Sequence, residues 1–383
     1  SGGSLERMSI IALGVMPYIT ASIVVQLASA LSPTLGALKK EGESGRKKLN
    51  QYTRYGTVLL TTIQGYFIAT SLEAQSAQNA IQAVLDPGLT FQISAIISLI
   101  GGTLFLMWIG EQITSRGIGN GVSLIIMAGI VASMPRTLAQ LFEQVRTGAM
   151  NGVLIVALLG GLFAVIWFIS FMERAQRRVL VQYPKRATAQ GMAQQERSHL
   201  PLKVNTAGVI PPIFASSLLL MPLTITQALG QRVDESSVWG STLLTLNQLF
   251  AHGKPLYMGL YALGILFFAF FYVAVVFNPE ETADNLKRQG GFIPGYRPGT
   301  ATSDYLDYVL TRITVIGAAY LAVVCLIPEW VTASTGVGLA LGGTSLLILV
   351  NVTIDTVSQI QSHLLAHQYA DLIKKAKLKG RMR

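Results

Sequence analysis

The sequence MSIIALGVMPYITASIVVQLASAL, residues 8–31, is the stretch that decides the fold. It is long enough to cross a bilayer, because about 20 apolar residues span the hydrocarbon core. Gly14 and Pro17 interrupt it, and Thr20 and Gln26 place polar groups at membrane depth. Proline kinks or breaks a helix, and irregular backbone survives in a membrane only where protein or a watery cavity surrounds it. We therefore expect a helix, bent at Pro17, that borders a path through the membrane.

Composition places the whole chain among polytopic membrane proteins. Of its 383 residues 51% are hydrophobic and 13% are charged, and the mean hydropathy is +0.49, whereas soluble domains carry about 25% charged residues. The single cysteine, Cys325, lies in an apolar run, which excludes an intramolecular disulfide and a thiolate metal cluster. The histidines are scattered, and no nucleotide loop or nucleophile motif is present. We expect no catalytic residue, no metal, no cofactor and no enzymatic activity.

Apolar windows of about 19 residues predict an all-α bundle of membrane-spanning helices. The nine expected spans are residues 8–31, 56–75, 90–112, 120–140, 152–172, 205–229, 255–277, 309–331 and 341–365. Pro135 interrupts the fourth of them.

The segments between these spans alternate in basic charge. On one side, lysine plus arginine number six in 32–55, one in 113–119, seven in 173–204, three in 278–308 and six in 366–383. On the other side they number none in 76–89, one in 141–151, two in 230–254 and none in 332–340. Basic loops stay in the cytoplasm, so we expect a cytoplasmic C-terminal tail and an external Ser1. An external start predicts one further span before Ser1, ten in all.

We expect two halves, residues 1–148 and 149–383. Paired halves with broken helices are typical of transporters built from inverted repeats, and a secondary transporter of small solutes is one interpretation. It requires a polar midplane site with a coupling carboxylate. The intramembrane polar residues act either in such a pathway or in interhelical hydrogen bonds; they are Gln26, Asn120, Asn205, Asn351 and Asp355.

The segments 173–204 and 278–308 are longer than ordinary connections and rich in arginine. Their charge has two interpretations, attraction to anionic lipid headgroups or docking of a large anionic partner such as ribosomal RNA or an acidic protein. Arg297 is the sharpest candidate, because a Pro-Gly pair on each side would hold it at a loop tip. The docking candidates are Arg177, Arg178, Lys185, Arg186, Lys287, Arg288 and Arg297.

Aliphatic pairs at one-turn spacing stand beside two helix breakers. Val15 and Ile19 flank Pro17, and Val122 and Ile126 follow a Gly-Asn-Gly turn. Residues four apart share one helix face. Packing or lipid contact accounts for most such pairs, so the pattern by itself does not predict a pore.

Several segments, met in order along the chain, carry a family resemblance. They are ALGVMPYI (12–19), KKEGESGR (39–46), QYTRYG (51–56), GEQIT (110–114), RGIGNG (116–121), LPLKVN (200–205), NPEETADNLKR (278–288) and GGTSLLI (342–348). Together they resemble the SecY family of bacterial protein-conducting channels from its second helix onward. The resemblance implies ten helices in two pseudo-symmetric halves around a central pore, with a lateral gate toward lipid. It also implies that the first helix and the plug segment precede Ser1.

The resemblance further implies roles for particular residues. The ring that closes the pore falls on Val15, Ile19, Val122, Ile126, Ile213 and Ile348. The lateral gate and signal-sequence site fall on Thr20, Gln26, Asn205 and Met221. Arg177, Arg178 and Arg297 match cytoplasmic positions that contact the ribosome or the motor SecA in the family.

The implied partners are SecE, SecG, SecA, the ribosome with its nascent chain, signal peptides and membrane lipids, including anionic lipids. The implied location is the bacterial inner membrane. Beside this channel and the transporter, a scaffold that only docks ribosomes is a third interpretation.

Overall fold

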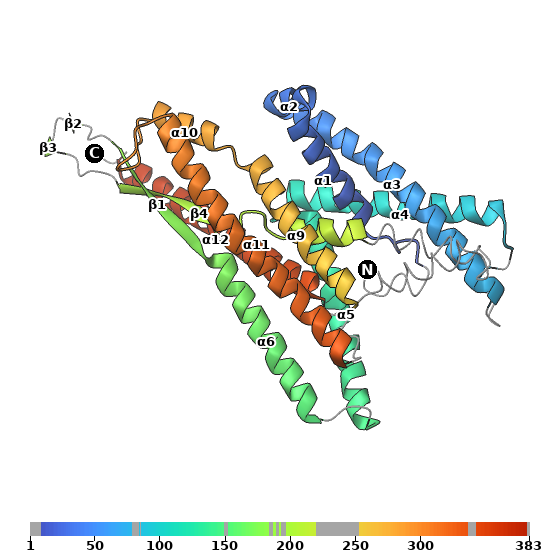
Figure 1. Cartoon of the computed structure of the whole chain (residues 1–383). Coiled ribbons are helices and arrows are strands. Elements are labelled where there is room, and N and C mark those ends of the chain that lie inside the picture. Colours follow the sequence, from blue (N-terminus) through green and yellow to red (C-terminus); the bar gives the residue numbers. More distant parts are fainter. Residues whose placement is uncertain are drawn as a thin grey trace. The chain divides into compact units, whose positions relative to one another are not determined.

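The structure, a computed structural model, describes part of the chain. The described residues are 9–78, 84, 86–148, 152–183, 187–188, 191–192, 197–219, 253–335 and 342–380. Its helices are α1 Met16–Leu31, α2 Pro33–Lys40, α3 Glu43–Gln78, α4 Leu89–Arg116, α5 Gly121–Arg146, α6 Gly152–Arg174, the short helix Ile210–Leu219, α9 Pro255–Val276, α10 Pro279–Arg288, α11 Thr300–Thr335 and α12 Gly343–Gly380. Its strands are β1 Gln176–Gln182, β2 Ala187–Thr188, β3 Gly191–Met192 and β4 Arg197–Lys203 (Figure 1).

The all-α expectation is confirmed, because most of the described chain is helical. Six of the described helices are long and apolar enough to cross a membrane. They correspond to the expected spans at 90–112, 120–140, 152–172, 255–277, 309–331 and 341–365. α1 is shorter, α3 is less apolar than these six, and the expected span 205–229 continues beyond the described residues.

The expected bend at Pro17 is wrong. Residues before Met16 form turns, in which Gly14 has φ +58°, and α1 begins at Met16. Its first hydrogen bond joins the Ile19 N–H to the Val15 carbonyl at 3.1 Å. Pro17 therefore stands in the first turn, where a helix loses nothing from a missing N–H.

Pro135 also acts differently from the expectation. α5 continues through it from Gly121 to Arg146 and is not interrupted there. A helix tolerates an internal proline when neighbouring groups satisfy the freed backbone. The basic segments are likewise more ordered than loops, since 33–40, 43–55, 279–288 and 366–380 are helical and 176–203 contains an antiparallel hairpin.

Contacts divide the chain into two compact units. The first comprises Ser1–Ser22, Asn50–Ala157 and Ser345–Arg383, and the second comprises Ile23–Leu49 and Leu158–Thr344. Within the first unit α4 packs on α5. Gly110 and Gly121 allow this approach, because a Cβ on Gly121 would overlap the Gly110 carbonyl oxygen.

Polar side-chain contacts stabilise the first unit at both ends of α4. The Arg54 guanidinium donates two hydrogen bonds to the Glu111 carboxylate, the shorter 2.6 Å long. At the other end, the Glu73 carboxylate accepts from the Gly88 N–H at 3.0 Å and from Gln92 Nε2 at 2.7 Å. A carboxylate at a helix N-terminus also meets the favourable end of the helix dipole.

In the second unit α11 is the central helix. It packs on α9 and on α10 (Figure 1), and its Leu306, Leu321 and Val324 are fully buried. α6, in contrast, exposes large apolar side chains such as Phe163 and Trp167, at 74% and 66%. Such an apolar face is typical of a helix that meets lipid.

Candidate functional site

The two long basic segments form one structure, which we call the basic platform and define as the described residues of 173–204 and 278–308. β1 and β4 pair antiparallel from Gln176–Lys203 to Gln182–Arg197. Gln182 and Phe292 then exchange two backbone hydrogen bonds of 2.9 Å, which join the hairpin to the second segment. Sequence reasoning treated these segments as separate loops.

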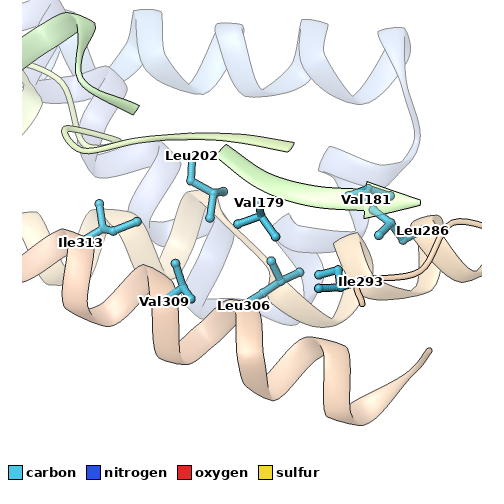
Figure 2. Packing of buried hydrophobic residues seen from close by; sticks show 8 residues of the cluster. All are labelled: Val179, Val181, Leu202, Leu286, Ile293, Leu306, Val309 and Ile313. Carbon is cyan, nitrogen blue, oxygen red and sulfur yellow. The ribbon is translucent and has the colours of Figure 1, made fainter. Parts of the chain in front are cut away.

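A hydrophobic cluster lies beneath the platform (Figure 2). Its members come from the hairpin, α10, the following turn and α11: Val179, Val181, Leu202, Leu286, Ile293, Leu306, Val309 and Ile313. Figure 2 shows Val179 and Leu202 of the hairpin pointing toward the side chains of α11, and Val181 lying beside Leu286. Burying a side chain of this size contributes about 1.5–3 kcal/mol, so the cluster fixes the platform on the N-terminal part of α11.

The described docking candidates are all exposed on this platform. Arg177 and Arg178 lie on β1, immediately before the buried Val179. Lys287 and Arg288 end α10, which buries its Ala283 and Leu286. Asn278 caps the start of α10 by accepting from the Glu280 and Glu281 N–H groups at 3.0 and 3.3 Å. Lys185 and Arg186 lie outside the described residues.

Arg297 is exposed in a braced turn. The neighbouring Gly295 and Gly299 have φ +91° and +118°, a region that side chains rarely adopt. The Arg297 carbonyl accepts a 2.9 Å hydrogen bond from Thr302 Oγ1. Tyr296 stacks on Tyr305 with a centroid distance of 4.2 Å, and Tyr305 packs against the platform cluster. The backbone that presents the guanidinium is therefore rigid.

The six ring candidates share a position that the sequence did not reveal: each stands at or near the start of a helix. Val15 and Ile19 bracket the start of α1, and Val122 and Ile126 lie in the first two turns of α5. Ile213 is in the first turn of the helix Ile210–Leu219, and Ile348 is the sixth residue of α12.

Their burial differs. Val15, Ile213 and Ile348 are 4%, 7% and 8% exposed, and the other three are half-buried. Ile213 belongs to the second unit and the other five to the first.

α5 and α12 meet within the first unit. Gln359 Oε1 accepts from the Gly119 N–H at 2.8 Å, and Thr353 Oγ1 lies 3.6 Å from Met127 Sδ. The order of these contacts makes the helices antiparallel. Asn120 caps α5 beside them, accepting from the Val122 N–H at 3.1 Å. Ile348 lies more than one turn before these contacts along α12.

The gate candidates have unlike surroundings. Thr20 Oγ1 donates to the Met16 carbonyl at 3.1 Å, and Gln26 is exposed. Asn205 is 6% exposed, and its Nδ2 donates to Glu173 Oε1 at 2.6 Å. Met221 lies outside the described residues.

Glu173 is the polar residue that sequence reasoning missed. It is 9% exposed in the last turn of α6. The available signal was a carboxylate directly after an apolar run, which a tally of intramembrane charges overlooks. Among the described residues, no group of three or more His, Cys, Asp or Glu side chains is arranged to hold a metal ion.

Comparison with known proteins adds the family. A family model described as SecY matches residues 9–357. The protein translocase subunit SecY of Vibrio cholerae is 52% identical over 380 residues, which cover 99% of this chain and 84% of that protein. The chain belongs to the SecY family. The SecY subunit of Escherichia coli K12 is 50% identical over 380 residues, which cover 99% of this chain and 84% of that protein.

Solved structures agree with the SecY assignment at the level of fold. A structure of SecY that concerns its plug domain and closed channel has a TM-score of 0.66 at 18% identity, covering 92% of this chain and 82% of that one. Sec61 in a canine ribosome-channel complex has a TM-score of 0.61 at 17% identity, covering 92% and 81%. This SecY-family chain is therefore a multi-pass membrane protein with the channel fold.

Proposed function

We propose that this chain is the passive, non-enzymatic channel through which unfolded secretory polypeptides cross the bacterial inner membrane. The observation that carries the proposal is family membership along 99% of the chain with proteins named translocase subunit SecY. A small-solute transporter has no comparable support.

The channel would consist of two halves, residues 1–148 and 149–383. Val15, Ile19, Val122, Ile126, Ile213 and Ile348 would form its constriction. Branched aliphatic side chains offer a moving polypeptide no hydrogen bonds, and a narrow apolar constriction resists ions by dewetting. Apolar segments would leave sideways into lipid past Thr20, Gln26, Asn205 and Met221, where signal peptides would also bind.

Energy would come from the SecA ATPase or from the ribosome, docked on the basic platform. Arg177, Arg178, Lys287, Arg288 and Arg297 are exposed there, and Lys185 and Arg186 belong to the same segment. Anionic lipids would meet the same charges. SecE and SecG would complete the complex, with the C-terminal tail 366–383 in the cytoplasm.

Reconstitution tests the proposal. The natural full-length protein that contains this chain, in vesicles with SecE and SecA, is expected to move a signal-bearing precursor to a protease-protected position when ATP is supplied. A precursor that stays protease-sensitive in such vesicles would contradict the proposal.

A second experiment separates a channel from a docking scaffold. Ile213→Asn and Ile348→Asn place amides in the constriction and are expected to raise ion leakage and to admit precursors with defective signals. Leu364→Asn is the control, because Leu364 is 58% exposed on the same helix as Ile348. A scaffold would respond to none of the three.

A further inference from the structure

The base of the platform hairpin is closed by two hydrogen bonds. The Val204 N–H, just after β4, donates to the Ala175 carbonyl, just before β1, at 3.0 Å. Asn205 follows Val204, and its Nδ2 donates to Glu173 Oε1 at 2.6 Å. The end of α6 and the start of the next membrane segment are thus held together where the docking hairpin begins and ends.

Glu173 has a second donor from a third element. The Tyr320 hydroxyl of α11 donates to Glu173 Oε1 at 3.4 Å, and Tyr320 is 4% exposed. Burying a carboxylate is costly unless hydrogen bonds satisfy it, and bonds to a charged acceptor are stronger than neutral ones. A residue that only filled space here would not need a carboxylate.

One face of α11 connects the hydrogen bonds of Glu173 to the hydrophobic cluster beneath the platform. Residues three or four apart share a helix face, and the buried face carries Leu306, Val309, Ile313, Gly317 and Tyr320. The first three belong to the platform cluster. A Cβ on Gly317 would stand 2.5 Å from the Val204 carbonyl oxygen, so α11 touches the hairpin base directly.

Asn205 links Glu173 to the segment that leads into the helix containing Ile213. Its Nδ2 also donates to the Gly208 carbonyl at 3.2 Å, within the turn that leads into Ile210–Leu219. Gly208 has φ +63°, so this turn has a fixed and unusual shape. Glu173 of α6 is therefore bonded directly to α11 and, through Asn205, to the turn that leads into the Ile213 helix.

We propose that Glu173 is a positioning residue that fixes the Ile213 helix relative to the docking platform, so that force on the platform reaches the constriction. This inference rests on the proposed function. Without the carboxylate, the platform would still bind its partner, but its movement would no longer be transmitted to Ile213.

The test compares Glu173→Ala with Glu173→Gln, whose amide oxygen still accepts from Asn205 and Tyr320. Asp86→Ala is the control, an exposed carboxylate outside the platform. SecA affinity and the rate of precursor translocation at saturating SecA are measured separately in vesicles. We expect SecA affinity to stay unchanged in all three and translocation to fall by about tenfold in Glu173→Ala alone, because two buried donors lose their acceptor.

A distance measurement stands apart from translocation. Spin labels at Ser198 on β4 and Leu218 on the Ile213 helix, both exposed, are expected to give one narrow distance distribution in the otherwise unchanged protein and in Glu173→Gln. Glu173→Ala should broaden it. If no protein translocates, the proposed function fails while this measurement still decides the positioning role.

Other results overturn the inference. A narrow distance distribution together with normal translocation in Glu173→Ala would contradict it. An equal loss of translocation in Glu173→Gln or in Asp86→Ala would also contradict it. If Glu173→Ala does not assemble, Tyr320→Phe decides: it removes one donor, and a fall of about threefold at unchanged SecA affinity supports the proposal, whereas an unchanged rate contradicts it.

Discussion

Single residues in this chain are defined by what surrounds them more than by their type. Arg54 and Arg297 are both basic residues of expected cytoplasmic segments, yet Arg54 is paired with Glu111 and Arg297 is exposed on a braced turn. The first holds α3 against α4, and the second is presented to solvent. Only the second is suited to dock a partner.

Replacing Arg297 with alanine should weaken docking without altering the fold. An exposed ionic contact is worth about 1 kcal/mol or less, so we expect SecA or ribosome affinity to fall by up to about fivefold. The dependence of binding on salt should become shallower. Arg146→Ala is the control, since Arg146 is exposed but paired with Glu143 at 2.6 Å. Equal losses in both variants would contradict a specific role.

At the scale of elements, helix contacts depend on glycines that hydropathy does not distinguish. α5 contains Gly121 and Gly129. A Cβ on Gly121 would overlap the Gly110 carbonyl of α4, whereas a Cβ on Gly129 would meet nothing within 4 Å. The sequence predicted both helices, but it could not tell which glycine faces the neighbour.

Gly121→Ala should therefore destabilise the protein by about 1–3 kcal/mol, the usual cost of overpacking. Gly129→Ala should stabilise it slightly, because alanine favours a helix by up to about 1 kcal/mol over glycine. The midpoint of thermal unfolding in detergent measures both. Similar midpoints for the two variants would show that α4 and α5 do not touch at Gly110.

At the scale of the whole molecule, the distribution of basic charge predicts the orientation in the membrane. Ser198 lies in a segment expected in the cytoplasm and Asp86 in one expected outside, and both are exposed. Cys325, the single native cysteine, is 1% exposed and gives little background.

A membrane-impermeant maleimide is expected to label Ser198→Cys in inverted vesicles and Asp86→Cys in intact cells. Each site should be protected in the opposite preparation. Labelling of both sites from one side would contradict the orientation that the positive-inside rule predicts.

The sequence by itself determined the helical class, the approximate position of six membrane-crossing helices and the family, because hydropathy and ordered motifs are local properties. It did not predict the start of α1 at Met16 or the continuous α5, since a proline's effect depends on its place in a helix. It also did not predict the hairpin of β1 and β4. Only tertiary structure joined the basic segments through Gln182 and Phe292 and placed Glu173 against Asn205 and Tyr320. Such contacts join residues far apart in the chain, and their geometry arises only when the helices pack.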